Sequence, residues 1–230
     1  MAKKKQEKQE KEIEVGAILS RSEQFIEKNK NLLIYGFGGI IVVIGLILAY
    51  HYGYAQPRNE KAKVAIFAGQ HYFEIDSFAL ALNGNGVDYD GFEAIANSYG
   101  GTKAGNLAKA YAGICYYKLG NPQSAMKYLK SYKGSDTQLA PALTGLIGDC
   151  LVSAGDTKAA IGYFEKAAAK ADNEFISPIY LKKAGIAYES LQNYKDAIRV
   201  YTTIKEKYNR STEAMEVDRY ITRAEILSKQ

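Results

Sequence analysis

The stretch Ala110–Tyr132, AYAGICYYKLGNPQSAMKYLKSY, has the pattern of two short helices joined by a turn. Gly113 stands where the two helices would touch, and the turn follows at Leu-Gly-Asn-Pro. Ala125 begins the second helix, and the bulky Leu129 comes four residues later. Because small residues let two helices pack about 8 to 10 Å apart while large ones fill the gap, the stretch predicts a helical hairpin.

The same pattern occurs twice more without gaps, at offsets of 35 and 37 residues. The copies are GLIGDCLVSAGDTKAAIGYFEKA from Gly145 and KKAGIAYESLQNYKDAIRVYTTI from Lys182. Each hairpin alone leaves an apolar face open, so the hairpins must stack on one another. We therefore predict an all-α fold built as an α-solenoid. The equivalent small, small and bulky residues are Gly148, Ala160 and Phe164, then Gly185, Ala197 and Tyr201.

This pattern resembles the tetratricopeptide repeat (TPR), whose period is 34 residues. The resemblance covers residues 105–207 as three TPR repeats. It departs from the family early in the first helices, where Lys109, Thr144 and Leu181 replace the usual Trp, and Gln192 replaces a turn Gly.

The resemblance implies a module that binds proteins through a concave groove lined by the first helices. The alternative is that this inner face is only solvated and that an edge or the last helix binds. The residues that the resemblance places in the groove are Ile114, Tyr117, Lys118, Asp149, Lys182, Ile186 and Glu189.

The segments on either side of the three repeats also read as helical. Residues 55–104 predict a degenerate helical repeat, interrupted by the loop NGNGVDYDG. The spacing of the Asn and Asp residues in this loop does not fit an EF-hand, so we interpret them as turn residues. Residues 208–230 predict a C-terminal capping helix.

A long uncharged stretch precedes the repeats. Asn31–Pro57 contains no Lys, Arg, Asp or Glu, and as a helix Leu32–Tyr54 would span roughly 35 Å, enough for a hydrocarbon core of about 30 Å. A signal peptide would have a shorter apolar run, and a soluble surface helix would keep a polar stripe. We therefore predict a transmembrane helix over residues 31–54. Gly45 and Ala49 form a small-xxx-small pair where another membrane helix can approach.

Lys and Arg indicate the orientation of this helix. Eight precede it and three occur in the twenty residues after it, although within twenty residues on each side the counts are four and three. This bias favours a cytoplasmic N-terminus. Residues 1–30 are predicted to be a charged cytoplasmic tail with a short amphipathic helix over Val15–Asn29. That helix either lies on the membrane or a partner, or merely leads into the transmembrane helix.

The sequence does not indicate catalysis. His71 and Glu74 have the one-turn spacing of a metal pair, but a second pair is missing. Cys115 and Cys150 fall at equivalent places in adjacent repeats, too far apart for a disulfide, so we expect two free, inert thiols. The net charge of +5 is scattered and does not favour nucleic acid. We predict no catalytic residues, no metal site, no cofactor and no small-molecule substrate.

The whole layout resembles the YfgM-type ancillary subunits of the Sec translocon. This resemblance implies a single-pass protein of the bacterial inner membrane with its TPR domain in the periplasm. The implied partners are translocon subunits, a periplasmic prolyl isomerase or chaperone, and exported client proteins. A TPR scaffold for another envelope complex, such as the cell-division or a secretion apparatus, needs the same anchored solenoid and stays open.

Overall fold

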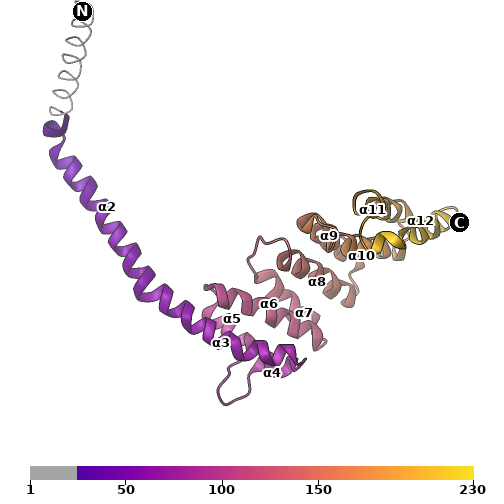
Figure 1. Cartoon of the computed structure of the whole chain (residues 1–230), viewed down its shortest axis with the longest axis horizontal. Coiled ribbons are helices and arrows are strands. Elements are labelled where there is room, and N and C mark those ends of the chain that lie inside the picture. Colours follow the sequence, from indigo (N-terminus) through magenta and orange to yellow (C-terminus); the bar gives the residue numbers. More distant parts are fainter. Residues whose placement is uncertain (1–24) are drawn as a thin grey trace, which may run out of the picture. The chain divides into compact units, whose positions relative to one another are not determined.

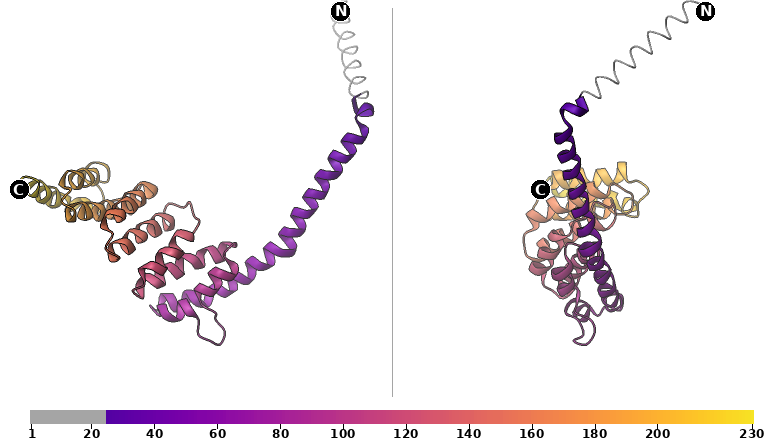
Figure 2. Two further views of the ribbon diagram at one scale, coloured as in Figure 1. Left: turned by 180° about the vertical axis from the view of Figure 1, so that it is seen from behind. Right: turned by 90° about the vertical axis from the view of Figure 1, so that its left-hand side faces the viewer.

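The computed structural model describes residues 25–230 and separates into two compact units, residues 1–57 and residues 58–230. All regular secondary structure within the described residues is helical, as predicted (Figures 1 and 2). Most of the amphipathic segment predicted over residues 15–29 lies outside the described residues.

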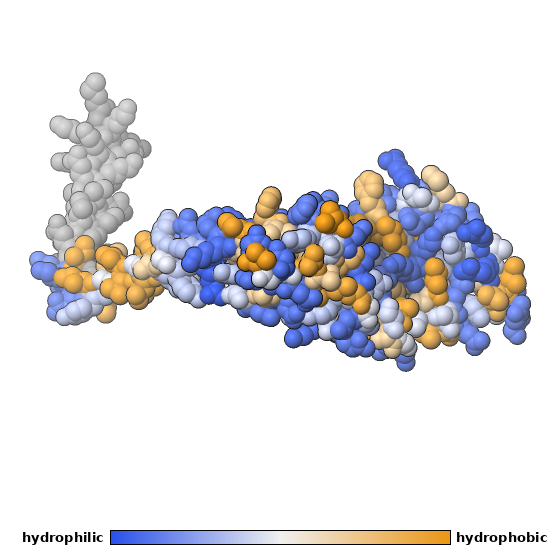
Figure 3. All heavy atoms as spheres, turned by 90° about the horizontal axis from the view of Figure 1, so that it is seen from below, coloured by the Kyte–Doolittle hydropathy of each residue, from blue (hydrophilic) through white to orange (hydrophobic). Residues whose placement is uncertain are grey.

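The first unit contains α2 (Lys30–Tyr50), a 21-residue helix that is long and apolar enough to span a membrane. No residue of its most apolar 18-residue window is buried within the structure. In Figure 3 the helix next to the grey residues is coloured mainly hydrophobic. Length and apolar composition are what the structure shows of this helix. Gly45 and Ala49 both lie exposed on α2.

The predicted end of this helix, at residue 54, is not a break in helical structure. A π-helical turn, His51–Ala55, follows α2 and leads directly into α3 (Gln56–Glu74). Pro57 lacks a backbone N–H, so one intrahelical hydrogen bond is lost just where the π-helical turn ends. α2, the π-helical turn and α3 thus follow one another without a gap, and α3 is the first predicted helix of the degenerate repeat.

The second unit contains the three predicted hairpins, stacked in chain order (Figures 1 and 2). An Asn or Asp side chain caps each second helix by accepting the backbone N–H three residues further on. These caps start the second helices directly after the predicted turns. The helices are α6 (Lys103–Lys118) with α7 (Pro122–Ser131), α8 (Leu139–Ser153) with α9 (Thr157–Ala171), and α10 (Ser177–Ser190) with α11 (Tyr194–Lys207).

The predicted contact between a glycine and a bulky residue holds each hairpin together. A Cβ atom added at Gly113 would lie 2.6 Å from Leu129 Cδ2, and one at Gly148 would lie 2.6 Å from Phe164 Cε1. At Gly185 it would overlap Tyr201 Cε1. Distances below 3.0 Å leave no room for a methyl group, so the crossings require glycine. The alanines that open the second helices, Ala125, Ala160 and Ala197, are fully buried.

The degenerate repeat uses the same contact. A Cβ atom on Gly69 of α3 would overlap the hydroxyl of Tyr89 in the loop and would lie 2.6 Å from Phe92 Cε1, at the start of α5 (Phe92–Tyr99). Here the helix pair is separated by the short α4 (Phe78–Asn83) and by the predicted loop. Asn85 organises that loop, because its Oδ1 accepts the backbone N–H groups of residues 87, 88 and 89. The loop asparagine is therefore a turn residue, as predicted.

The chain ends on a single helix, α12 (Val217–Leu227), preceded by a 3-10 turn at Glu213–Met215. Ser211 caps this turn, since its Oγ accepts the N–H of Ala214 at 3.2 Å. The buried residues Val217 and Ala224 pack against the α11 core. α12 corresponds to the predicted C-terminal capping helix.

Gly185→Ala is expected to destabilise the protein by about 1–3 kcal/mol, because the new methyl group overlaps the buried ring of Tyr201. Gly162→Ala is the matched control, since nothing lies within 4 Å of its added Cβ on the exposed side of α9. This control should stabilise the helix by about 0.5–1 kcal/mol. Urea unfolding followed by circular dichroism measures both. Equal effects of the two substitutions would show that the glycine crossings do not limit packing.

Candidate partner-binding groove

The seven residues expected in the groove lie on the first helices α6, α8 and α10. On α6, Ile114 and Tyr117 are half-buried and Lys118 is exposed. The Lys118 Nζ atom lies 5.7 Å from the centroid of the Phe78 ring on α4, which brings the degenerate repeat next to this end of α6. Burial, followed by the nearby charge of Asp149, raises the pKa of Tyr117.

Two of the seven residues, Asp149 and Ile186, lie together in one pocket. It has a volume of about 350 Å³ and is formed by α8, α9 and α10. Ile186 is 45% exposed, so an apolar surface faces solvent there. The other lining residues are Val152, Thr157, Phe164, Lys183, Ala187 and Ser190.

The charges in this pocket compensate each other. Lys183 Nζ donates to both carboxylate oxygens of Asp149, each at 2.7 Å. The same Nζ atom lies 5.8 Å from the ring centroid of Phe164 and 5.7 Å from that of Tyr180. Because the ammonium group is already paired and the remaining walls are largely apolar, the pocket suits an uncharged, apolar side chain.

Two of the other three charged groove residues, Lys182 and Glu189, are also engaged in ion pairs. Lys182 pairs with Glu216, and this hydrogen bond raises the pKa of Lys182. Glu189 accepts from Arg223 at 2.9 Å and from the hydroxyl of Tyr201 at 2.7 Å. Burial, followed by the hydrogen bond to Glu189, raises the pKa of Tyr201.

These ion pairs follow the repeat. The partners of Asp149, Lys182 and Glu189 each lie 34 residues further along the chain. Glu165 of α9 pairs with Arg199 of α11 at the same separation and at 2.8 Å. Each pair therefore joins one helix to the equivalent helix that follows it. Asp149, Lys182 and Glu189, three of the four charged residues expected in the groove, therefore also bridge neighbouring repeats.

Sequence reasoning missed several residues of the pocket. Val152 occupies the position of Tyr117 in the preceding repeat and of Glu189 in the following one, so the alignment itself could have found it. Thr157 and Phe164 come from α9, a second helix, which a rule based on first helices does not consider.

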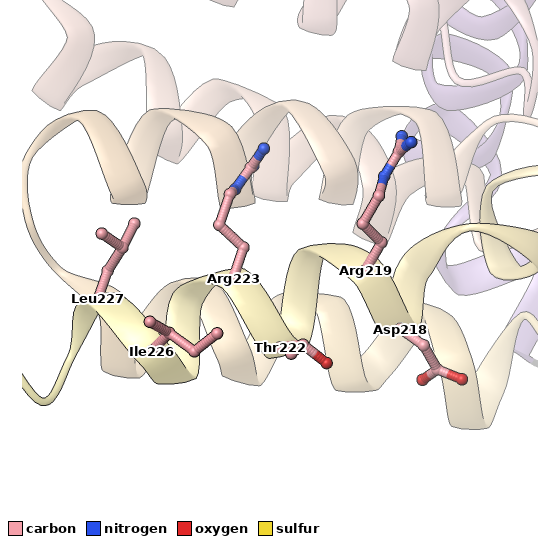
Figure 4. Close-up of a pocket in the computed structure, with 6 residues that line it drawn as sticks. All are labelled: Asp218, Arg219, Thr222, Arg223, Ile226 and Leu227. Atoms are coloured by element: carbon pink, nitrogen blue, oxygen red, sulfur yellow. The ribbon is translucent and has the colours of Figure 1, made fainter.

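A second hollow, of about 530 Å³, lies on the outside of the capping helix (Figure 4). Arg219, Arg223 and Leu227 rise on one side of α12, while Asp218 points to the other. All six lining residues belong to α12 itself, so the hollow is the outer surface of one helix rather than a groove between repeats. The six are Asp218, Arg219, Thr222, Arg223, Ile226 and Leu227.

The remaining candidate catalytic or metal-binding residues do not line the groove pocket. Cys115 and Cys150 are buried and free, as predicted, and burial raises the pKa values of their thiols to about 12 and about 11. His71 and Glu74 lie exposed on α3. From residue 25 onward, no group of three or more His, Cys, Asp or Glu side chains is placed to hold a metal ion.

Comparison with protein families gives one match: a family model described as tetratricopeptide repeat matches residues 111–135. This stretch is similar to one tetratricopeptide repeat. The match covers the second half of α6 and all of α7, and the same glycine contact recurs in the next two hairpins. Repeats of this family are protein-interaction scaffolds, so the match supports a protein-interaction module. Comparison with curated proteins and with solved structures found no match.

Arg223→Gln is expected to cost about 1–2 kcal/mol of stability, because it leaves the carboxylate of Glu189, only 11% exposed, without its cation. Arg219→Gln is the matched control. Arg219 is 72% exposed and pairs with Glu216 one turn away, so its loss should cost less than about 0.5 kcal/mol. Thermal unfolding of both variants tests this difference. If the two variants unfold at the same temperature, the pairs between repeats do not stabilise the solenoid.

Proposed function

We propose that the chain is a membrane-anchored TPR protein whose groove binds a segment of a partner protein. The pocket between α8, α9 and α10 carries this proposal, because it presents an apolar surface on first helices whose charges are already paired. An apolar side chain of an extended segment fits such a pocket, while the hydroxyls of Thr157 and Ser190 can bond to the segment's backbone. Ile114 and Tyr117 continue the same row of positions on α6.

The exposed apolar surface of α2 supports the membrane part of the proposal. An uncovered helix of this length would aggregate in water, whereas in a bilayer every apolar side chain faces hydrocarbon. We propose that it crosses the membrane once, with the N-terminus in the cytoplasm as the Lys and Arg bias suggests. Gly45 and Ala49 would let a helix of a membrane partner approach α2.

We propose further that the protein is an accessory subunit of the Sec translocon. It would hold its repeats in the periplasm and assist a prolyl isomerase or chaperone with exported proteins. The resemblance of the whole layout to the YfgM-type subunits supports this assignment, and the apolar pocket is suited to an unfolded client or to a partner chaperone. No bond is made or broken in this role.

The test is in-cell crosslinking of the full tagged chain, gentle solubilisation and mass spectrometry. Translocon subunits together with a periplasmic chaperone are expected above the level found with an unrelated single-span protein. Recovery of division or secretion-apparatus proteins instead would make the protein a scaffold of another envelope complex and reject the translocon assignment.

Ile186→Asp should reduce recovery of the groove partner at least about tenfold, because a carboxylate in the apolar pocket cannot be paired. Phe175→Asp is the matched control: Phe175 is 83% exposed in the loop between α9 and α10 and does not line the pocket. Both variants should keep the melting temperature of the native chain. Equal recovery of the partner by the two variants would contradict binding in this pocket.

A further inference from the structure

Lysines gather on the outer sides of α7 and α9, the second helices of the first two hairpins. α7 contains no acidic residue, and α9 contains only Glu165. Six exposed lysines belong to these helices or follow them directly, and we call them the lysine face. They are Lys127, Lys130, Lys133, Lys158, Lys166 and Lys170.

Contacts between the two helices make this one continuous surface. Lys130 Nζ of α7 lies 5.8 Å from the ring centroid of Tyr163 on α9. In the opposite direction, Lys170 Nζ of α9 donates to the carbonyl of Gly134, just after α7, at 3.4 Å. Along α9, Lys158, Lys166 and Lys170 are spaced by multiples of four residues and therefore share one side of the helix.

Four of the acids around this surface already have other partners, while Glu93 and Glu174 form no ion pair with the six lysines. Glu165 pairs with Arg199 at 2.8 Å, and Asp172 pairs with Lys207 at 2.6 Å. Asp156 accepts the N–H of Ala159 as the N-cap of α9. Asp136 accepts three backbone N–H groups at the start of α8, those of residues 138, 139 and 140. Across residues 25–230 none of the six lysines takes part in an ion pair.

The repeats that follow are more mixed in this respect. From α10 onward the cations Lys182, Lys183, Lys205 and Lys207 each have a carboxylate partner, whereas Lys195, Arg210 and Lys229 take part in no ion pair among the described residues. On α7 and α9 none of the six lysines has such a partner, and contacts between the two helices bring them onto one surface. Such a surface attracts an anionic partner.

We propose that the lysine face binds the anionic lipid headgroups of the bilayer that holds α2. This inference rests on the proposed membrane anchor. Ammonium groups on flexible stems suit many mobile phosphates better than one fixed ligand, and no walled cavity is needed. Anchoring also keeps the repeats permanently within reach of the bilayer, so weak individual contacts add up. The contact would fix which side of the solenoid faces the membrane and leave the groove pocket open to proteins.

The test uses the full chain in lipid nanodiscs with a fluorophore at Gly162→Cys. Gly162 lies between Lys158 and Lys166, and an added Cβ there meets nothing within 4 Å. The native thiols of Cys115 and Cys150 are buried, so the label reacts at the new site alone. A quencher placed at the lipid headgroups reports contact with the bilayer.

Quenching is expected in nanodiscs that contain phosphatidylglycerol and not in pure phosphatidylcholine. It should disappear near 1 M salt, where the Debye length is about 3 Å. The triple variant Lys130→Gln, Lys166→Gln, Lys170→Gln should lower the ratio of bound to unbound label at least about tenfold. The triple variant Lys103→Gln, Lys195→Gln, Lys229→Gln removes the same charge from exposed sites elsewhere and should bind as the native face does.

Equal quenching in both lipids, or an equal effect of the two triple variants, would overturn the proposal. The proposal would also be overturned if the label stays unquenched in phosphatidylglycerol nanodiscs while an acidic protein crosslinks to the native chain. In that case the crosslink would be absent in the variant Lys130→Gln, Lys166→Gln, Lys170→Gln. Retention of the unlabelled chain in phosphatidylcholine vesicles after alkaline extraction is measured separately. This extraction tests the α2 anchor alone. A failure of the anchor can therefore be told apart from a failure of the lysine face.

Discussion

The close approach of two helices over a glycine is the constraint on which the rest of the structure depends. It recurs at Gly69, Gly113, Gly148 and Gly185, each beneath a bulky residue of the second helix. At this spacing one methyl group on the first helix would collide with the side chain that fills the gap. The packing of each hairpin is therefore determined by the sizes of its facing side chains. The side chains that remain exposed on the first helices form the surface available to partners.

Charge then sets how one hairpin follows another. Ion pairs between residues 34 apart run from α8 to α10, from α9 to α11 and from α10 to α12. Since the pairs of Asp149, Lys182 and Glu189 use charges of the first helices, our proposal assigns partner recognition to the apolar pocket around Val152 and Ile186. The division is physical: a charge that is already paired gains little from a ligand, whereas an exposed apolar wall gains by being covered.

The hairpins, their turns and their glycine contacts were predictable because each depends on residues close together in sequence. The alignment of the repeats could also have predicted Val152 as a groove residue. The roles of Asp149, Lys182 and Glu189 were not predictable, because a charge that contacts a ligand and one that bridges two repeats look alike until their partners are placed.

The central claim is that a protein partner occupies the groove pocket while α2 holds the chain in a membrane. The most direct measurement places a photoreactive amino acid at Val152, in the pocket, and separately at Met215, which is 85% exposed before α12. The account predicts one discrete crosslinked protein from position 152 in native membranes, lost when Ile186 is replaced by Asp, and no such product from position 215. The same product from both positions, or only from position 215, would contradict it.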